Sequence, residues 1–321
     1  MCLLPKKGDL SLLQNWRTIS LTNCDPKIFT RIINSRMILA ADHIINVHQT
    51  GFMRGRFIGD NGIILKSLID YAHLDPRYNE TVALLLDFMK AYDRANSEYL
   101  HAALTHYGIP PHLVQCIIDF FFQTKIRVNV NGYLTEPISQ QRGLRQGDPL
   151  SPILFNLALE PLLQTTLQDP LLPGVLPYTL YRDSGIPTAL KTLAYADDVL
   201  VVLTRPSEYA ILQRHLHIYE RASNGKLNTS KTQVLSVTGK PLGPNWLNTP
   251  SPNISDSSIS SAEVKLSKKI KYFVGGGSKE WKPKDKHLID GVNITKVFQK
   301  FRKQTIGGVG KGKDIHCLRI L

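Results

Sequence analysis

The chain has 321 residues, 42% of them hydrophobic and 20% charged, which is the composition of a globular protein with a sizeable core in one large or two modest domains. No apolar run is long enough to span a membrane, the first residues turn polar too soon for a signal peptide, and four scattered cysteines without CxxC spacing indicate neither a zinc site nor a disulfide framework. The formal net charge of +13 comes mostly from residues 265–321, which hold 15 Lys and Arg against 4 Asp and Glu, so the body of the chain is nearly neutral.

A short strand and a helix are predicted near the start of the chain. Residues 15–21 read as a short strand that carries Arg17. Asp25 as N-cap and Pro26 as first helical residue predict a helix that continues through Met37 with apolar residues at helical spacing.

A basic loop punctuated by glycines follows at residues 49–56 and carries Arg54 and Arg56. It has neither GxGxxG nor Walker spacing, so it is no nucleotide-binding loop by pattern. On its own the pattern favours a surface turn over a contact with a phosphate backbone. Asp60 is predicted to begin the next helix.

Residues 81–88 predict a buried strand that ends in the carboxylate of Asp87. An ionised carboxylate is costly to bury unless it is paired or bound to a metal ion. Lys90 is the structural partner available nearby, and a metal ion is the alternative. Helices are predicted over residues 97–107 and after Pro110.

Residues 125–130 alternate as a strand does, and the Asn-Gly pair after them predicts a hairpin turn. Residues 141–152 then form a polar loop with two glycines and two prolines, which leads into the apolar run of residues 153–167. We expect a buried helix there with Asp148 as N-cap, and its amino-terminal end offers free N–H groups to an anion.

Two adjacent carboxylates, Asp197 and Asp198, lie between apolar runs within residues 193–203. The runs predict two buried strands joined as a hairpin with the carboxylates at its tip. A divalent cation would remove the repulsion between them, and hard carboxylate oxygens suit magnesium. A solvated Asp-Asp turn is the alternative for such a pair alone, but Asp87 offers a third carboxylate in a similar setting.

The last part of the chain changes in character. A helix over residues 207–223 and a strand over residues 233–237 are predicted, with Lys231 in the loop between them. Residues 241–264 include a Ser/Pro/Asn-rich stretch typical of a linker, and residues 265–321 form a basic, glycine-rich tail with poor periodicity.

Six segments in this order resemble the reverse transcriptases of LINE-type (non-LTR) retrotransposons. The motifs are LDFMKAYD at residues 86–93, GLRQGDPLSP at 143–152 and YADD at 195–198, together with weaker matches at residues 15–21, 49–56 and 228–231. A lone YxDD is weak, whereas six segments in the family order, spanning residues 3–237, are specific. The resemblance implies an RNA-directed DNA polymerase that acts on an RNA template, a DNA primer and dNTPs.

The family's fold is α+β, a right hand whose palm is an antiparallel sheet backed by helices. The resemblance implies that residues 1–80 are partial fingers and residues 81–240 the palm. It implies that Asp87, Asp197 and Asp198 hold two Mg²⁺ ions, with Mn²⁺ as a possible substitute, for in-line nucleotidyl transfer.

Other roles follow by position in the motifs. Lys7, or Lys6 equally, together with Arg17, Gln146 and Gly147 would bind the nucleotide. Tyr92 would exclude the 2′-hydroxyl of a ribonucleotide, and Lys231 would act as general acid toward pyrophosphate. The arginines expected at the template are Arg54, Arg56 and Arg145.

The ends of the chain depart from the family pattern. No endonuclease precedes the polymerase motifs, and the expected thumb is missing or degenerate because residues 270–273 start its usual sequence and then give way to three glycines. We interpret the chain as a truncated copy whose tail is frameshifted.

Two interpretations therefore stay open, an enzyme and a catalytically incompetent remnant that binds nucleic acid at most, with a viral RNA-dependent polymerase as a weaker third. We expect no membrane contact and an intracellular location, nucleus or cytoplasm, and the sequence names no protein partner.

Overall fold

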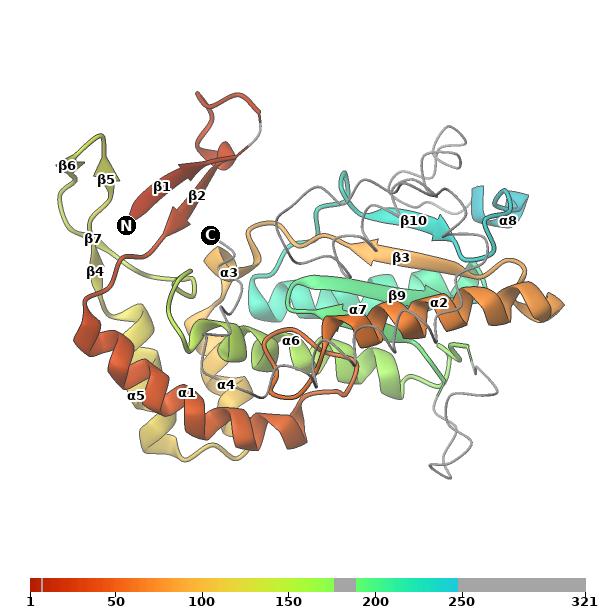
Figure 1. Cartoon of the computed structure of the whole chain (residues 1–321), viewed down its shortest axis with the longest axis horizontal. Helices are drawn as coiled ribbons and strands as arrows, with labels where there is room; N and C mark the ends of the chain where they lie inside the picture. Colours follow the sequence, from red (N-terminus) through yellow and green to blue (C-terminus); the bar gives the residue numbers. More distant parts are fainter. Residues whose placement is uncertain (7, 176–188, 248–321) are drawn as a thin grey trace, which may run out of the picture.

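The computed structural model describes residues 1–6, 8–175 and 189–247, and a four-stranded antiparallel sheet lies at its centre (Figure 1). The strand order is β10-β3-β9-β8. The bounds of these strands are Gln233–Ser236 for β10, Val82–Leu86 for β3, Asp198–Leu203 for β9 and Thr192–Tyr195 for β8. In the central pair Val82 lies opposite Leu203 and Leu86 opposite Val199, so the end of β3 and the β8–β9 turn meet at one edge of the sheet.

Apolar residues on both faces explain why β3 and β9 are the central strands. All five residues of β3 are buried, and successive side chains of a strand point to opposite faces. Val82, Leu84 and Leu86 therefore join the larger hydrophobic cluster, while Ala83 and Leu85 join a smaller one on the other face. The continuous apolar run predicted this two-sided burial.

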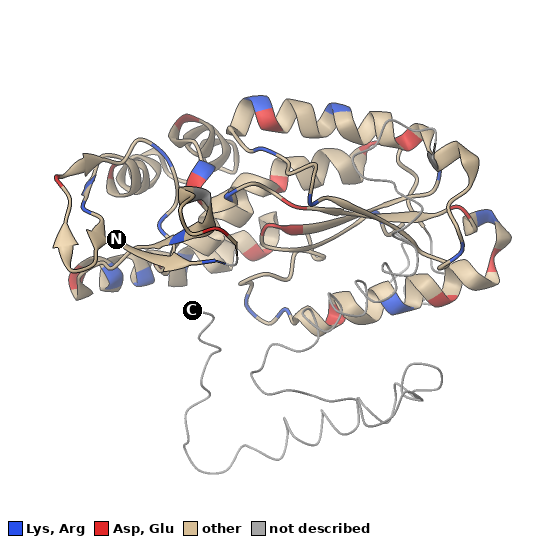
Figure 2. Cartoon of the chain, turned by 90° about the horizontal axis from the view of Figure 1, so that it is seen from above, with Lys and Arg blue, Asp and Glu red and all other residues tan. Residues whose placement is uncertain are grey.

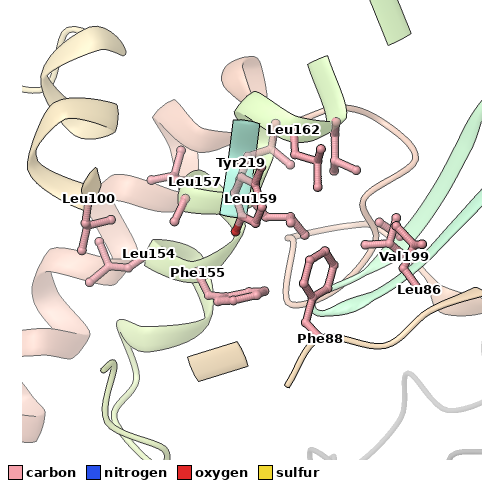
Figure 3. Packing of buried hydrophobic residues seen from close by; sticks show 14 of the residues in the cluster. Leu86, Phe88, Leu100, Leu154, Phe155, Leu157, Leu159, Leu162, Val199 and Tyr219 are labelled. Carbon is pink, nitrogen blue, oxygen red and sulfur yellow. The ribbon is translucent and has the colours of Figure 1, made fainter. Parts of the chain in front are cut away.

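Helices cover both faces of the sheet. The larger cluster receives side chains from five helices, α1 (Cys24–Ile44), α4 (Ser97–His106), α5 (Pro111–Phe122), α6 (Ser151–Gln168) and α7 (Ser207–Ser223). Most of α6 is buried, and its leucines pack beside Phe88 and Val199 of the sheet layer (Figure 3). On the other face α2 (Ile58–Leu74) supplies Leu65, Leu68 and Ala72.

A second sheet of order β2-β1-β5-β6 lies at the end of the molecule that carries the amino terminus (Figure 1). Its strands are β1 (Cys2–Pro5), β2 (Trp16–Ile19), β5 (Asn129–Val130) and β6 (Tyr133–Leu134), and a small third sheet pairs β4 (Lys125–Ile126) with β7 (Ile138–Ser139). β1 runs antiparallel to β2 and parallel to β5. The start of the chain is thus joined to residues 125–139, more than a hundred residues away.

The shorter elements are α3 (Ala91–Arg94), α8 (Pro244–Leu247) and two 3₁₀ turns at Leu13–Asn15 and Pro76–Tyr78. Acidic and basic side chains are interspersed over the described elements (Figure 2), as expected of a nearly neutral body. None of the described helices combines the length and apolar character that crossing a membrane requires.

Most predicted elements are confirmed, with shifted ends. α1 begins at Cys24 after Asn23 rather than after Asp25, and α2 begins at Ile58. The single strand predicted over residues 125–130 is wrong, because β4 and β5 belong to different sheets and the N–H of Val128 between them donates to Thr135 Oγ1. The linker predicted over residues 241–264 is wrong in its described part, because Pro244–Leu247 form α8 and Trp246 is buried in the larger hydrophobic cluster. The rest of that segment and the whole basic tail lie outside the described residues.

Candidate active site

Three carboxylates meet at one edge of the central sheet. Asp87 directly follows β3, whose last residue Leu86 is paired with Val199 of β9. Tyr195 and Asp198 are paired across the β8–β9 hairpin, so Ala196 and Asp197 form its two-residue turn. The structure thus places the strand-end carboxylate beside the hairpin tip, as the sequence predicted.

The three carboxylates are close enough to repel one another. Burial, together with the charges of Asp198 and Asp87, raises the pKa of Asp197 to about 6, although Arg17 acts in the opposite direction. The positive charge nearby therefore does not compensate the repulsion. A group of anionic side chains held together at a cost to stability is a common mark of a functional site.

The donor chemistry of this edge fits a divalent cation. Carboxylate oxygens are the preferred ligands of Mg²⁺, and a cation bound among Asp87, Asp197 and Asp198 would cancel their repulsion. Within the described ranges, no three His, Cys, Asp or Glu side chains are gathered closely enough to enclose a metal ion as they stand. The case that this edge fits a divalent cation therefore rests on the three carboxylates and their mutual repulsion, and not on a preformed coordination shell.

The turn that carries Asp197 has an unusual backbone. Ala196 adopts a left-handed conformation with φ of 52°, which is rare for a residue other than glycine. The fully buried side chain of Gln49 holds it from both sides, because its Oε1 accepts from the N–H of Ala196 at 2.8 Å and its Nε2 donates to the Ala196 carbonyl at 3.2 Å. We name these two hydrogen bonds the Gln49 clamp.

Glycine at position 51 is required for the Gln49 clamp. A Cβ on Gly51 would lie 2.3 Å from the backbone nitrogen of Ala196, far inside contact distance. The Gly51 carbonyl accepts from Asn156 Nδ2 of α6 at 2.6 Å, and Asn61 Nδ2 of α2 donates to the Ala194 carbonyl at 3.0 Å. Buried amides from two helices thus fix the loop and the hairpin to each other.

The pattern of residues 49–51 predicts a basic surface loop and gives no sign of this role. Gln49 and Ala196 are 147 residues apart, and no local pattern predicts such a contact. The only available signal was a glycine next to polar residues that have no helical or strand periodicity.

Tyr92 belongs to α3 and lies next to the three carboxylates. Its ring is stacked on Phe155 of α6, with centroids 4.7 Å apart and planes tilted by 16°. Burial, together with the charge of Asp197 and the nearby Tyr195, raises the pKa of the Tyr92 hydroxyl. The aromatic ring is therefore fixed in place beside the candidate metal site.

The loop before α6 is attached to both α3 and β2. Gln146 Nε2 donates to Asp93 Oδ1 at 3.3 Å, and the same carboxylate oxygen accepts from Thr18 Oγ1 at 3.5 Å. The Gln146 carbonyl accepts from the N–H of Ser20 at 2.9 Å. Gly147 has φ of 103°, and a Cβ there would lie 3.2 Å from the Ser20 carbonyl oxygen. Asp93, which the sequence analysis did not select, thus connects Gln146 to the strand of Arg17.

Basic side chains gather near the carboxylates. Burial and the positive charges of Arg17, Lys90 and Lys231 lower the pKa of Lys6, which places these four side chains within electrostatic range of one another. The loop that carries Lys231 runs along Asp87, whose carbonyl accepts from the N–H of Asn228 at 2.7 Å. Lys7 lies outside the described residues.

The three arginines predicted at the template differ in their surroundings. Arg54 is exposed. Arg56 donates from Nη1 and Nη2 to carbonyls around the end of α1 and forms an ion pair with Asp42, so it already has a structural role.

Arg145 is 6% exposed and donates to the Phe120 carbonyl, Thr124 and Gln140. This corrects the expectation of an arginine free to reach a template, because its guanidinium is already bound within the protein. Its packing on the rings of Phe120 and Phe121 explains why an arginine can be buried there.

A protein-family profile described as "Reverse transcriptase (RNA-dependent DNA polymerase)" matches residues 4–272. The chain belongs to this reverse transcriptase family.

The curated relatives confirm the predicted LINE-type, or non-LTR, character of this reverse transcriptase. The chain is 34% identical over 236 residues to the transposon TX1 uncharacterized 149 kDa protein of Xenopus laevis, which covers 73% of the chain and 17% of that protein. It is 28% identical to the retrovirus-related Pol polyprotein of the R2DM element of Drosophila melanogaster, covering 74% and 21%. The chain thus spans about a fifth of the length of these relatives.

A solved structure supports a polymerase fold for this reverse transcriptase. Telomerase from Candida albicans, in complex with a fragment of telomeric RNA, matches with a TM-score of 0.50 and 14% identity, covering 97% of this chain and 56% of that one. At this identity the likeness concerns the fold alone.

We predict that Gln49 is a positioning residue for the carboxylates. Gln49→Leu removes both hydrogen bonds of the Gln49 clamp, so the turn that carries Asp197 relaxes. The expected result is a fall in kcat for nucleotide addition of about 10-fold to 100-fold with little change in KM.

Steady-state kinetics measures both parameters, and Gln115→Leu, at an exposed position of α5, is the matched control. Equal kcat in Gln49→Leu and the parent, at equal folded fraction by circular dichroism, would contradict this role.

Proposed function

We propose that this chain forms the catalytic part of an RNA-directed DNA polymerase, which adds dNTPs to the 3′-hydroxyl of a DNA primer opposite an RNA template. The central sheet and its helices serve as the palm, within residues 81–240. Residues 1–80 contribute fingers, and the pairing of β1 with β5 supports adding residues 125–139 to that unit. The observation that carries the proposal is the meeting of Asp87, Asp197 and Asp198 at one sheet edge.

Asp87, Asp197 and Asp198 are the residues that would hold two Mg²⁺ ions, or Mn²⁺ in their place. Such ions supply activation of the primer hydroxyl and neutralisation of charge on the phosphates. The raised pKa of Asp197 means that its carboxylate loses its proton only as the pH rises through about 6. Asp197 is then available as a ligand at neutral pH.

The basic side chains around the carboxylates suit a triphosphate. Arg17 and Lys6 belong to the β1–β2 end of the molecule and Lys231 to the loop before β10, so phosphates between them would be neutralised from two sides. Lys231 holds a proton at Nζ that can pass to the departing pyrophosphate, the general-acid role proposed for it.

Tyr92, Gln146 and Gly147 would surround the sugar and base of the incoming nucleotide. The ring of Tyr92 is immobilised on Phe155, which suits it to exclude a 2′-hydroxyl by contact. Gln146 is oriented by Asp93, and at Gly147 the absence of a side chain lets the loop lie close to the Ser20 carbonyl.

Primer extension on an RNA template with Mg²⁺ and dNTPs tests the proposed activity. We expect extension by the full chain, and a loss of about 100-fold or more in Asp197→Asn, because a neutral amide cannot replace an ionised metal ligand. Asp25→Asn, at an exposed position on α1, makes the same chemical change away from the site and keeps the parent's rate.

Extension by Asp197→Asn at the parent's rate would refute the site. Failure of the parent on every RNA template and primer pair tested, with both Mg²⁺ and Mn²⁺, would favour a remnant that binds nucleic acid without catalysis.

Tyr92→Val tests selection of the sugar. Removing the ring opens space for a 2′-hydroxyl, so the ratio of kcat/KM for rNTP to that for dNTP should rise about 10-fold to 200-fold. Tyr99→Val, which removes a half-buried ring that packs on Tyr219 instead, leaves the ratio unchanged. An unchanged ratio in Tyr92→Val, with dNTP addition retained, would show that another group excludes ribonucleotides.

A further inference from the structure

α3 is a single helical turn that depends on contacts from outside the helix. It spans Ala91–Arg94, and Lys90 before it has a left-handed backbone with φ of 47°. A helix this short is not stable by itself, because forming the first turn fixes several residues in return for one hydrogen bond. Tyr92 belongs to this turn, so the position of its ring depends on what holds α3.

The loop before α6 holds one side of α3 through backbone contacts. The N–H of Leu144 donates to the Tyr92 carbonyl at 2.8 Å, and the N–H of Gly143 donates to the Ala95 carbonyl at 2.8 Å. A Cβ on Gly143 would lie 2.9 Å from the Asp93 carbonyl oxygen, so the close approach requires glycine.

Two side chains that bind each other hold the other side of α3. Arg94 Nε donates to the Asn224 carbonyl at 2.8 Å and Arg94 Nη2 donates to Asn224 Oδ1 at 3.2 Å. Asn224 Nδ2 donates back to the Arg94 carbonyl at 3.0 Å, across a separation of 130 residues. Arg94 takes part in none of the ion pairs found among the described residues, so its planar donor group serves geometry here. We name these three hydrogen bonds the Arg94–Asn224 link.

Asn224 is itself fixed relative to the edge of the sheet that carries the carboxylates. The chain that follows it runs beside residues 87–89, with an antiparallel bridge between Phe88 and Leu227. The first of these residues, Asp87, accepts a hydrogen bond from the same loop. The Arg94–Asn224 link therefore joins α3 to the backbone that positions a candidate metal ligand.

Packing behind α3 leaves room for it to move. A cavity of about 20 Å³ has walls from α3, α4, α6 and α7, and Arg94, Phe155 and Tyr219 line it. Phe155 carries the ring on which Tyr92 is stacked. Atoms that face a void lack packing partners on that side, so the hydrogen bonds of the link carry more of the task of holding α3.

Asn224 also ends α7, which is a purely structural role. Its backbone is left-handed, with φ of 60° and ψ of 10°, a conformation that asparagine tolerates and glycine prefers at the end of a helix. Asn224→Gly therefore keeps the helix end and removes the two hydrogen bonds made by the side chain. This substitution separates the link from the helix end.

We propose that Arg94 and Asn224 are positioning residues for Tyr92. By fixing α3 to the edge of the sheet, they hold the Tyr92 ring where it meets a 2′-hydroxyl. Both act through α3 and not by contact with the nucleotide. The inference rests on the proposed function, because an effect on sugar selection requires the role proposed for Tyr92.

The ratio of kcat/KM for rNTP to that for dNTP measures this positioning. Asn224→Gly and Arg94→Met should each raise the ratio about 3-fold to 10-fold, less than Tyr92→Val does, because the ring is displaced but still present. The double variant should raise it no further than the larger single effect, since both substitutions break one link. In a Tyr92→Val background, Asn224→Gly should leave the ratio unchanged.

The chain offers a matched control for each substitution. Asn131 also has a left-handed backbone, with φ of 51°, and is exposed in a hairpin turn, so Asn131→Gly makes the same change away from α3. Arg221→Met removes an exposed arginine from α7. Both controls should keep the parent's ratio.

Hydrogen exchange followed by mass spectrometry tests the position of α3 without turnover. In Asn224→Gly the amides of residues 90–95 and 143–144 should exchange about 10-fold faster than in the parent, while those of β3 keep the parent's rate. Exchange at the parent's rate in residues 90–95 would overturn the inference whether or not the chain extends primers.

The kinetic outcomes separate this inference from the proposed function. A ratio that rises in Tyr92→Val but stays at the parent's value in Asn224→Gly would overturn the inference and leave the proposed function intact. An unchanged ratio in Tyr92→Val would refute the role proposed for Tyr92, and the inference would fall with it.

Discussion

The structure of the candidate site depends on the Gln49 clamp around the left-handed turn at Ala196. A residue with a Cβ in that conformation is strained by about 1–2 kcal/mol, and the buried amide of Gln49 compensates by bonding both polar groups of its backbone. Because Gly51 contacts the same turn, and Asn156 of α6 holds Gly51, the turn is fixed to the core helix as well as to the sheet. The position of Asp197 is thus determined by residues from three distant parts of the chain.

This rigidity allows the protein to keep like charges together. The backbone positions of Asp197 and Asp198 are fixed, since one lies in the turn and the other is paired with Tyr195, and Asp87 directly follows a fully buried strand. Their repulsion costs stability in the protein without a bound cation. Binding of a cation would remove the repulsion among the carboxylates. The nearby positive charges of Lys6, Arg17 and Lys231 favour binding of the triphosphate.

Much of this arrangement could be predicted from the sequence, because it depends on local patterns. The apolar runs before Asp87 and around Asp197 predict the buried strands, and antiparallel pairing brings their carboxylates together. The order of the motifs predicts the family. The contacts that the sequence did not reveal are made by polar side chains across long separations. Gln49 lies in a segment predicted to be a surface turn, and Arg145 in a polar loop where it is expected to contact a template, yet each is buried with its polar atoms paired.

Binding of Mn²⁺, followed by electron paramagnetic resonance as the loss of the free-ion signal, tests most directly whether the three carboxylates form a cation site. The measurement needs neither template nor turnover, and Mn²⁺ accepts the oxygen ligands that suit Mg²⁺. Asp87→Asn and Asp197→Asn should each weaken binding by about 10-fold or more, while Asp25→Asn binds as the parent does. Binding in which Asp87→Asn and Asp197→Asn match the parent would show that this edge of the sheet is not the metal site.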